Sequence, residues 1–363
     1  MKKLLIAAAF ALAAVAGASP AWADHSGDVG QGFTPVEFAV LPDGVRYPEG
    51  IAADPATGDI YVGTFDFGPN SNALLRFSRN GKLIAQKDLG SAPLLGLAFG
   101  PDGKVYFLNT GSLTGTQSKV QRIAASFTAS TPIEDVAVVP SIGAPGPRTV
   151  GNPDGSSDLI TFGSAGAPAP NGMVFDASGN LYFSDSFQGA IFRIAHAAAC
   201  SGCSVTTFAH DPLLATAGFP PFGANGLAFG TDNSTMFIAN TGDNRVLKMD
   251  MASAQISVFA ESVHGADGLL FDKSTGLLWV AANQADELVA LNANGRPVLK
   301  VGDFEGIGHD GAPRGFLFPA SMVIQDGFMY VTNLALPLTA AVGDEPEEDV
   351  TRWNVVRLRI GRH

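Results

Sequence analysis

The chain has 363 residues, of which 43 are glycine and 23 are proline, while only 15% are charged. This balance is typical of short strands joined by many turns rather than of a helical protein. The formal net charge of −12 and the lack of a basic cluster exclude nucleic acids and anionic membrane surfaces as partners attracted by charge.

The first 23 residues have the pattern of a secretory signal peptide. Two lysines precede a short apolar run, and an Ala-Trp-Ala cleavage site ends at Ala23. The apolar run is shorter than the roughly 20 residues that a membrane span needs. We therefore expect residues 1–23 to be removed and residues 24–363 to form a periplasmic or secreted protein that is free of the membrane.

One motif recurs six times along the rest of the chain. Each copy has a short apolar run, a turn rich in Gly, Asp, Asn and Ser, and a second apolar run, which predicts a β-hairpin. The copies begin at Pro48, Leu94, Pro170, Ala224, Ala266 and Pro319. Two more strand-like runs usually follow each hairpin, so we predict an all-β, six-bladed β-propeller with four-stranded blades. The whole of residues 24–363 is expected to form this single domain.

Two strand-like runs are left over at the ends of the mature chain, VEFAVL near the N-terminus and NVVRLRI near the C-terminus. We expect one of them to complete the blade of the other, which closes the ring and removes exposed sheet edges.

The only two cysteines, Cys200 and Cys203, lie between two predicted strands. An exported protein favours a local disulfide between them, because oxidation persists outside the cytoplasm. A redox centre and a metal site with His196 are the alternatives.

The first strand of each repeat begins at an equivalent dipeptide, whose second residue is glycine in five of the six copies. Equivalent positions on six radially arranged strands converge on the channel axis, so the side chains before these glycines should meet there. Asn-Gly and Asp-Gly are also hairpin-turn signals. Each copy, however, has its own turn several residues later. The six positions are Glu49, Leu95, Asn171, Asn225, Asp267 and Ala320.

Four of these positions, Glu49, Asn171, Asn225 and Asp267, would bring together two carboxylates and two amide oxygens. Such hard donors suit Ca²⁺ first, then Mg²⁺ or Mn²⁺, whereas Zn²⁺, the remaining alternative, prefers nitrogen and sulfur. Without a cation, the two carboxylates would repel each other and be poorly solvated. The sequence therefore predicts a divalent metal site at the mouth of the channel.

The long irregular segments should lie on the same face as the metal, because strand direction places the blade-to-blade connections there. The longest, from Ser141 to Pro170, is expected to cover the substrate pocket. His210, His264 and His309 fall in such segments, and the last two are candidate catalytic residues. An outer polar ring is expected from the residues that end the second strands: Thr64, Asp185, Asn240, Asn283 and Asn333.

The blade starts PEG, PNGMVFD, ANGLAF and ADGLLFD resemble those of the gluconolactonase and regucalcin (senescence marker protein) family. Related propellers are diisopropyl fluorophosphatase, the paraoxonases and strictosidine synthase. The resemblance implies a catalytic Ca²⁺ or similar ion and hydrolysis of lactones or phosphoesters. It also implies metal binding by Glu49, Asn225 and Asp267, with Asn171 as a fourth ligand or a contact to substrate and water. Asp267 would act as base or nucleophile.

The leading hypothesis is an exported, metal-dependent hydrolase that acts on a small lactone or a related ester or phosphoester. Its candidate catalytic residues are Asp267 and Asn171, with His264 and His309 as further candidates. The alternatives are a binding propeller with a structural cation and a lyase like strictosidine synthase. The sequence has no G-x-S-x-G motif, which argues against a serine hydrolase. A monomer is the expected oligomeric state.

Overall fold

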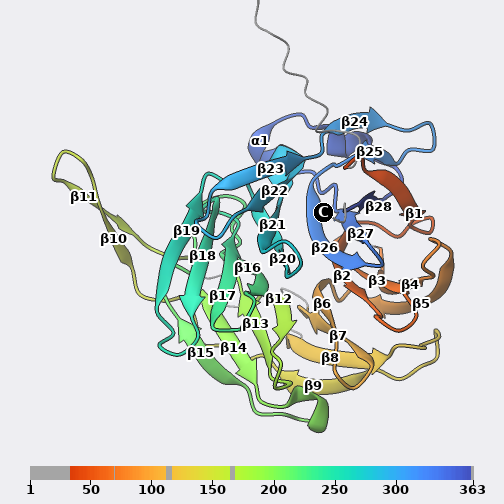
Figure 1. Cartoon of the computed structure of the whole chain (residues 1–363), viewed down its shortest axis with the longest axis horizontal. Coiled ribbons are helices and arrows are strands. Elements are labelled where there is room, and N and C mark those ends of the chain that lie inside the picture. The colour runs from red at the N-terminus through yellow and green to blue at the C-terminus, as the bar shows by residue number, and fades with distance from the viewer. Residues whose placement is uncertain (1–32, 69, 112–116, 164–167, 361–363) are drawn as a thin grey trace, which may run out of the picture. The chain divides into compact units, whose positions relative to one another are not determined.

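Six four-stranded antiparallel sheets in the described part of the chain surround a common centre (Figure 1). The computed structural model describes residues 33–68, 70–111, 117–163 and 168–360, so the predicted signal peptide lies outside them. The predicted six-bladed propeller is confirmed. Within the described residues, no helix is both long and apolar enough to cross a membrane.

The blades follow the order of the sequence repeats. The first blade contains β2 (Pro48–Ala53), β3 (Ile60–Thr64), β4 (Asn72–Phe77) and β5 (Leu83–Gly90). The second contains β6 (Leu94–Phe99), β7 (Lys104–Asn109), β8 (Lys119–Ala124) and β9 (Glu134–Val138). The third contains β12 (Pro170–Phe175), β13 (Leu181–Asp185), β14 (Ala190–Ile194) and β15 (Thr206–His210).

The remaining three blades repeat this pattern. The fourth contains β16 (Ala224–Phe229), β17 (Thr235–Asn240), β18 (Arg245–Asp250) and β19 (Ile256–Glu261). The fifth contains β20 (Ala266–Asp272), β21 (Leu277–Ala282), β22 (Glu287–Leu291) and β23 (Pro297–Val301). The sixth contains β26 (Pro319–Gln325), β27 (Phe328–Asn333), β28 (Asn354–Arg359) and β1 (Val36–Val40).

The two ends of the described chain close the ring together, as predicted. β1 pairs antiparallel with β28 and forms the outermost strand of the sixth blade. The N-terminal strand therefore covers the edge of the sheet that carries the C-terminal strand, and it leaves neither strand without a partner on that side.

Four short helical turns and two hairpins lie outside the blades in the described residues. The helical turns are η1 (Ala197–Ala199), η2 (Asn283–Ala285), α1 (Thr339–Val342) and η3 (Pro346–Asp349). The hairpins are formed by β10 (Arg148–Gly151) with β11 (Ser157–Ile160), and by β24 (Phe304–Ile307) with β25 (Pro313–Gly315).

Aromatic side chains join neighbouring blades into a rigid frame. Tyr106 of β7 packs edge-on against Phe175 of β12, with ring centroids 5.0 Å apart. Tyr182 of β13 packs in the same way against Phe229 of β16, at 5.5 Å. The first strands of adjacent blades also contact each other around the channel. This packing holds the first strands in place, together with their side chains that point toward the channel.

A β-bulge lies at the predicted dipeptide in the first strand of each blade. In β2, for example, the register shifts between Pro48 and Ile51, so that Glu49 and Gly50 form the bulge. The other five first strands shift at the equivalent place. A bulge re-aims a side chain, and here it turns the residue before the glycine toward the channel. The dipeptides are therefore bulges and not hairpin turns.

The glycine of the dipeptide is required by its neighbour in the next blade. A Cβ atom on Gly50, Gly96, Gly172, Gly226 or Gly268 would collide with the backbone carbonyl oxygen of the channel residue in the following blade. The sixth blade has Ser321 at this position. Its contact with the first blade includes a hydrogen bond of 2.7 Å from the Thr332 hydroxyl group to the carbonyl oxygen of Glu49. Close approach of the inner strands thus explains the repeated glycine.

Cys200 and Cys203 form a disulfide, as predicted, with Cα atoms 5.6 Å apart. The loop that carries it packs on the second blade, where the Cys203 N–H donates to the Val136 carbonyl oxygen at 2.7 Å. Neither cysteine lines the cavity described below.

We expect the Cys200→Ser/Cys203→Ser double variant to keep the turnover and metal affinity of the wild type. The disulfide closes a very short loop, so its loss should lower the free energy of unfolding by no more than about 2 kcal/mol. Urea unfolding and steady-state kinetics on the same preparations check both statements. Loss of activity at unchanged stability would show that the disulfide has a role in the site.

Candidate active site

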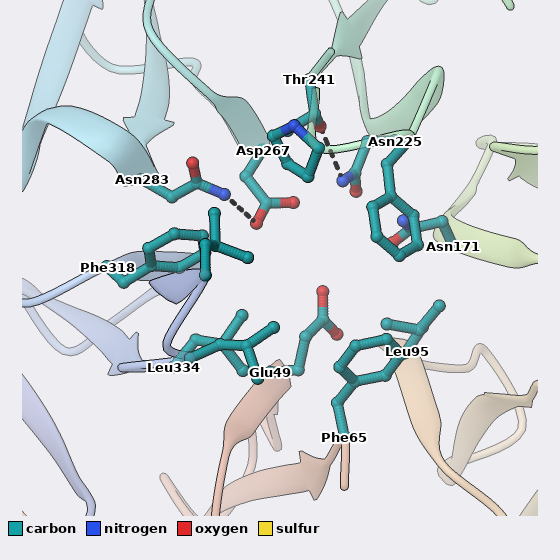
Figure 2. A pocket seen from close by; sticks show the side chains of 14 residues that line it. Glu49, Phe65, Leu95, Asn171, Asn225, Thr241, Asp267, Asn283, Phe318 and Leu334 are labelled. Atoms are coloured by element: carbon teal, nitrogen blue, oxygen red, sulfur yellow. Dashed lines mark hydrogen bonds between the residues drawn. The ribbon is translucent and has the colours of Figure 1, made fainter. Parts of the chain in front are cut away.

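The four predicted metal ligands lie around one cavity at the channel mouth (Figure 2). Glu49 comes from β2, Asn171 from β12, Asn225 from β16 and Asp267 from β20, and each is at most 5% exposed. The cavity holds about 420 Å³ of empty space, part of it open to solvent. Figure 2 shows the carboxylates of Glu49 and Asp267 pointing toward each other across it.

Two hydroxyl groups orient the two amides. Asn171 Nδ2 donates to Ser186 Oγ at 3.0 Å, and Asn225 Nδ2 donates to Thr241 Oγ1 at 2.9 Å. Each hydroxyl must accept here, because its own proton goes to a backbone carbonyl oxygen of the next blade, at 2.8 Å for Ser186 and 2.7 Å for Thr241. The amide nitrogens are thereby held away from the cavity, and the amide oxygens are left to face it.

Besides Asn283 Oδ1, three buried side-chain oxygens of residues that line the cavity have no hydrogen-bond partner among the described residues. They are Glu49 Oε2, Asn171 Oδ1 and Asp267 Oδ1. The other oxygen of Asp267, Oδ2, accepts from Asn283 Nδ2 at 3.0 Å. A buried acceptor without a partner is destabilising. Three such acceptors around one space therefore fit a cation that would bind them together.

The electrostatics of the two carboxylates lead to the same conclusion. Burial raises the pKa of Glu49 well above its usual range, and the nearby charge of Asp267 raises it further. Burial also raises the pKa of Asp267 to about 7, against the lowering effect of the hydrogen bond from Asn283. The ionised pair is therefore unstable without a positive charge. A divalent cation would balance it.

The donor set also indicates which cation fits. No three His, Cys, Asp or Glu side chains among the described residues are arranged to hold a metal ion. A site here must therefore use amide oxygens beside its two carboxylates. Oxygen donors of this kind suit Ca²⁺, Mg²⁺ or Mn²⁺ better than Zn²⁺.

We expect Thr241→Val to lower the affinity for Ca²⁺ by about 10- to 100-fold, since loss of a group that orients a ligand typically has this effect. The substitution keeps the shape of the side chain but leaves the Asn225 amide free to turn. Thr241→Ser retains the hydroxyl and should bind Ca²⁺ as the wild type does. Calorimetric titration of both variants tests this, and equal affinity for Thr241→Val would contradict it.

The walls of the cavity are apolar. Eight of the 14 residues that line it are hydrophobic: Phe65, Leu95, Pro220, Phe222, Phe318, Leu334, Leu336 and Leu338. They come mostly from loops, in the segments that follow β3, β15, β25 and β27. Leu95 is the channel residue of the second blade, so one of the two apolar positions predicted at the channel contributes to the wall.

No protein-family model matches the sequence, and no curated protein sequence matches it. The fold has solved counterparts. A luciferin-regenerating enzyme aligns with a TM-score of 0.60 at 16% identity, over 90% of this chain and 95% of that one. A gluconolactonase from Xanthomonas campestris gives 0.53 at 13% identity, over 91% and 96%. A calcium-binding regucalcin from Agrobacterium tumefaciens gives 0.54 at 16% identity, over 90% and 96%.

The three neighbours are propellers of the gluconolactonase and senescence marker protein type. The resemblance inferred from the sequence is therefore confirmed at the level of the fold. At such low identity the similarity establishes the fold alone.

The structure does not bring the predicted catalytic histidines to the cavity. His264 and His309 are exposed, and neither is among the residues that line it. The side chain of Val263 is buried between the fourth and fifth blades, and the next residue, His264, is exposed. His309 lies in the turn between β24 and β25. We therefore assign no catalytic role to either histidine. His210, which ends the outer strand β15, is exposed as well.

The predicted cover over the pocket is also not found. No described residue between 141 and 170 lines the cavity. Its residues 148–160 form the β10–β11 hairpin, which projects away from the blades in Figure 1. Two contacts hold the base of the hairpin against the blades. Gln188 Oε1 accepts a hydrogen bond from the Gly143 N–H at 3.1 Å, and Arg148 forms an ion pair with Asp243 at 3.3 Å.

Most residues of the expected outer polar ring form hydrogen bonds with the backbone of loops. Asp185 accepts hydrogen bonds from the backbone of Ala169 and Gln188. Asn240 donates to two carbonyl oxygens in the loop at 213–215, and Asn333 donates to Gly315. Only Asn283 of the five predicted residues lines the cavity.

The residues that orient the amides stand one position after the second strand. Ser186 follows β13 and Thr241 follows β17, at 15 and 16 residues from the amide that each holds. The residues predicted from the sequence are the last of the strand in these two blades, Asp185 and Asn240. The repeat itself carried the missing signal, since Asn283 occupies the same position after β21.

Proposed function

We propose that the protein is a divalent-metal-dependent hydrolase of lactones or related esters. The observation that carries this proposal is the set of three buried, unpartnered oxygens of Glu49, Asn171 and Asp267 around one cavity. The fold of a gluconolactonase and of a calcium-binding regucalcin supports it. Ca²⁺ is the proposed ion, with Mg²⁺ or Mn²⁺ as substitutes, held by these three residues and Asn225.

A bound divalent cation would supply Lewis-acid stabilisation of the negative charge that develops on the carbonyl oxygen of the ester. The chain itself provides the group that starts the reaction. Asp267 is held by Asn283 through Oδ2, which leaves Oδ1 directed at the cavity. Hydrogen bonds to Ser186 and Thr241 hold the Asn171 and Asn225 amides in fixed orientations at the same cavity.

Asp267 has two possible roles. As a base, it accepts a proton from water while the water oxygen bonds to the carbonyl carbon. The C–O bond of the ester then breaks, and the same proton goes to the leaving alkoxide. As a nucleophile, Asp267 bonds to the carbonyl carbon itself and displaces the alkoxide, and water then hydrolyses the acyl-aspartate.

The test is turnover of simple lactones and aryl esters by chelator-treated protein before and after addition of Ca²⁺, Mg²⁺ or Mn²⁺. Turnover that requires one of these ions is expected. In a single turnover in H₂¹⁸O, a first product without ¹⁸O identifies Asp267 as the nucleophile, because attack of water on the aspartyl carbon of the acyl-aspartate leaves an oxygen from the protein in the product. Metal binding without turnover of any ester would contradict the hydrolase and favour a binding propeller.

We also propose that the protein acts outside the cytoplasm on a small-molecule substrate, as a monomer. The pattern of residues 1–23 supports export. N-terminal sequencing of the protein recovered from periplasm or medium should begin after Ala23. Sedimentation should give the mass of one chain. A retained N-terminus in the cytoplasmic fraction would contradict export.

A further inference from the structure

The polar groups of the cavity are confined to its floor. Six polar residues line the cavity: Glu49, Asn171, Asn225, Thr241, Asp267 and Asn283. Their side-chain hydrogen bonds are made with each other, with Ser186 and with the Ala266 carbonyl oxygen. The free oxygens of Glu49, Asn171 and Asp267 face the proposed ion. Seven apolar side chains from the loops form the walls, together with Leu95 from the second blade. None of the described residues that line the cavity is Lys, Arg or His.

We propose that the site is selective for a neutral ester or lactone that carries an apolar alkyl or aryl group, and that it discriminates against polyhydroxylated sugar lactones and phosphate esters. The inference rests on the proposed hydrolase function and names its substrate class. The ester carbonyl would meet the floor, and the apolar group would lie against the walls.

The walls disfavour a sugar lactone because they offer no hydrogen bonds. Phe65, Phe222 and Phe318 present rings, and Leu334, Leu336 and Leu338 present aliphatic groups. Each substrate hydroxyl beside them would lose its hydrogen bonds with water and gain none. An alkyl or aryl group in the same place would be transferred out of water, which is favourable.

The charges disfavour a phosphate ester. Recognition of phosphate usually depends on Arg or Lys side chains that approach its oxygens. At the cavity, the only ionisable residues that line it are Glu49 and Asp267, within the part of the chain that the structure describes. Their two negative charges would balance a divalent ion and leave no net positive charge for a phosphate.

Aromatic side chains continue from the wall to the surface. Phe67 is 51% exposed and packs edge-on against Phe65, with ring centroids 4.6 Å apart. The ring of Phe65 in turn lies 6.2 Å from that of Phe222, between centroids. Phe219, three residues before Phe222 in the same loop, is 44% exposed. An apolar group longer than the cavity would therefore meet further apolar surface at the opening.

Phe318 is held in the wall by its backbone. Its φ of 46° lies in the left-handed region, which is unfavourable for an aromatic residue. Asp286 Oδ1 accepts a hydrogen bond from the Phe318 N–H at 2.7 Å and keeps the chain in this conformation. The Phe318 ring, which is 4% exposed, is thus a fixed part of the wall.

The test is a series of γ-lactones with linear alkyl side chains of increasing length, compared with glucono-1,5-lactone. We expect kcat/KM to rise by about fourfold for each added methylene until the cavity is filled, the equivalent of about 0.8 kcal/mol per methylene. Glucono-1,5-lactone should be at least about 100-fold less efficient than the best alkyl lactone, because its hydroxyls would be left unpaired.

Leu336→Asn provides the variant, since Leu336 is only partly buried and lies in a loop. It should flatten the dependence on chain length and leave Ca²⁺ affinity unchanged. Leu83→Asn is the matched control, because Leu83 is 38% exposed on the outer strand β5 and does not line the cavity. This control should keep the slope of the wild type.

The outcomes separate this inference from the hydrolase proposal. Hydrolysis of glucono-1,5-lactone as efficiently as the alkyl lactones, or the same slope in Leu336→Asn, would overturn the inference and leave the hydrolase standing. Absence of turnover for all lactones and aryl esters would overturn the hydrolase. The rise in melting temperature with each compound would then decide the inference, because selective stabilisation by alkyl lactones is expected whether or not they are cleaved.

Discussion

Replacement of Asp267 by asparagine is expected to lower kcat by about 10²- to 10⁴-fold at saturating Ca²⁺, the range typical of the loss of a general base. The variant keeps the size of the side chain and one oxygen that can bind the ion. It loses the negative charge and the reactive lone pair of Oδ1, the atom that faces the cavity without a partner. Ca²⁺ binding should weaken but remain measurable, so kcat can be compared at saturation.

Glu49→Gln is the matched control for this variant. It makes the same change from carboxylate to amide at a residue with no assigned reactive role, across the cavity from Asp267. Excess Ca²⁺ should restore most of the rate in Glu49→Gln but not in Asp267→Asn. If excess Ca²⁺ restores both variants fully, Asp267 is a metal ligand only.

The second large effect is expected in the metal affinity and apo stability of Glu49→Gln. Loss of one of two carboxylate ligands should weaken Ca²⁺ binding by more than the roughly 10- to 100-fold typical of a group that only orients a ligand. The metal-free variant, in contrast, should melt above the metal-free wild type. It no longer buries a carboxylate beside Asp267, where burial and like charge oppose ionisation.

The raised pKa values also determine how the stability of the metal-free protein changes with pH. The pKa values of Glu49 and Asp267 are raised in the folded protein, that of Asp267 to about 7. Their protonated forms therefore stabilise the fold fully below the ordinary carboxyl pKa of about 4. That stabilisation is lost as the pH rises toward about 7. The metal-free wild type should lose stability over this range.

Scanning calorimetry between these pH values checks the prediction. Saturating Ca²⁺ should remove the loss of stability, because the ion balances both charges, and Glu49→Gln should reduce the loss without Ca²⁺. A metal-free wild type whose melting temperature rises over the same range would indicate that other groups dominate the linkage.

Much of the fold could be predicted from the sequence because the inner strands are locally encoded. The dipeptide with glycine recurs since each inner strand needs a bulge and an adjacent residue without a side chain. That requirement identifies the channel residues even though their side chains differ, from Glu49 to Leu95. The position of the four polar residues around one cavity follows from the same repeat.

The walls could not be predicted, because loop paths depend on contacts between segments far apart in the sequence. Phe222 reaches the cavity in a loop whose neighbours are fixed by Asn240 and by the pairing of Thr216 with Asp243. The β10–β11 hairpin projects outward, and its Arg148 also pairs with Asp243. No local pattern around His264 or His309 shows that these side chains point away from the cavity.

The claim that Glu49, Asn171, Asn225 and Asp267 form a divalent metal site is tested most directly by isothermal titration of the chelator-treated protein with Ca²⁺. We predict one ion bound per chain in the wild type, and no measurable binding in the Glu49→Gln/Asp267→Asn double variant at the same concentrations. No binding of Ca²⁺, Mg²⁺, Mn²⁺ or Zn²⁺ by the wild type, or undiminished binding by the double variant, would contradict the account.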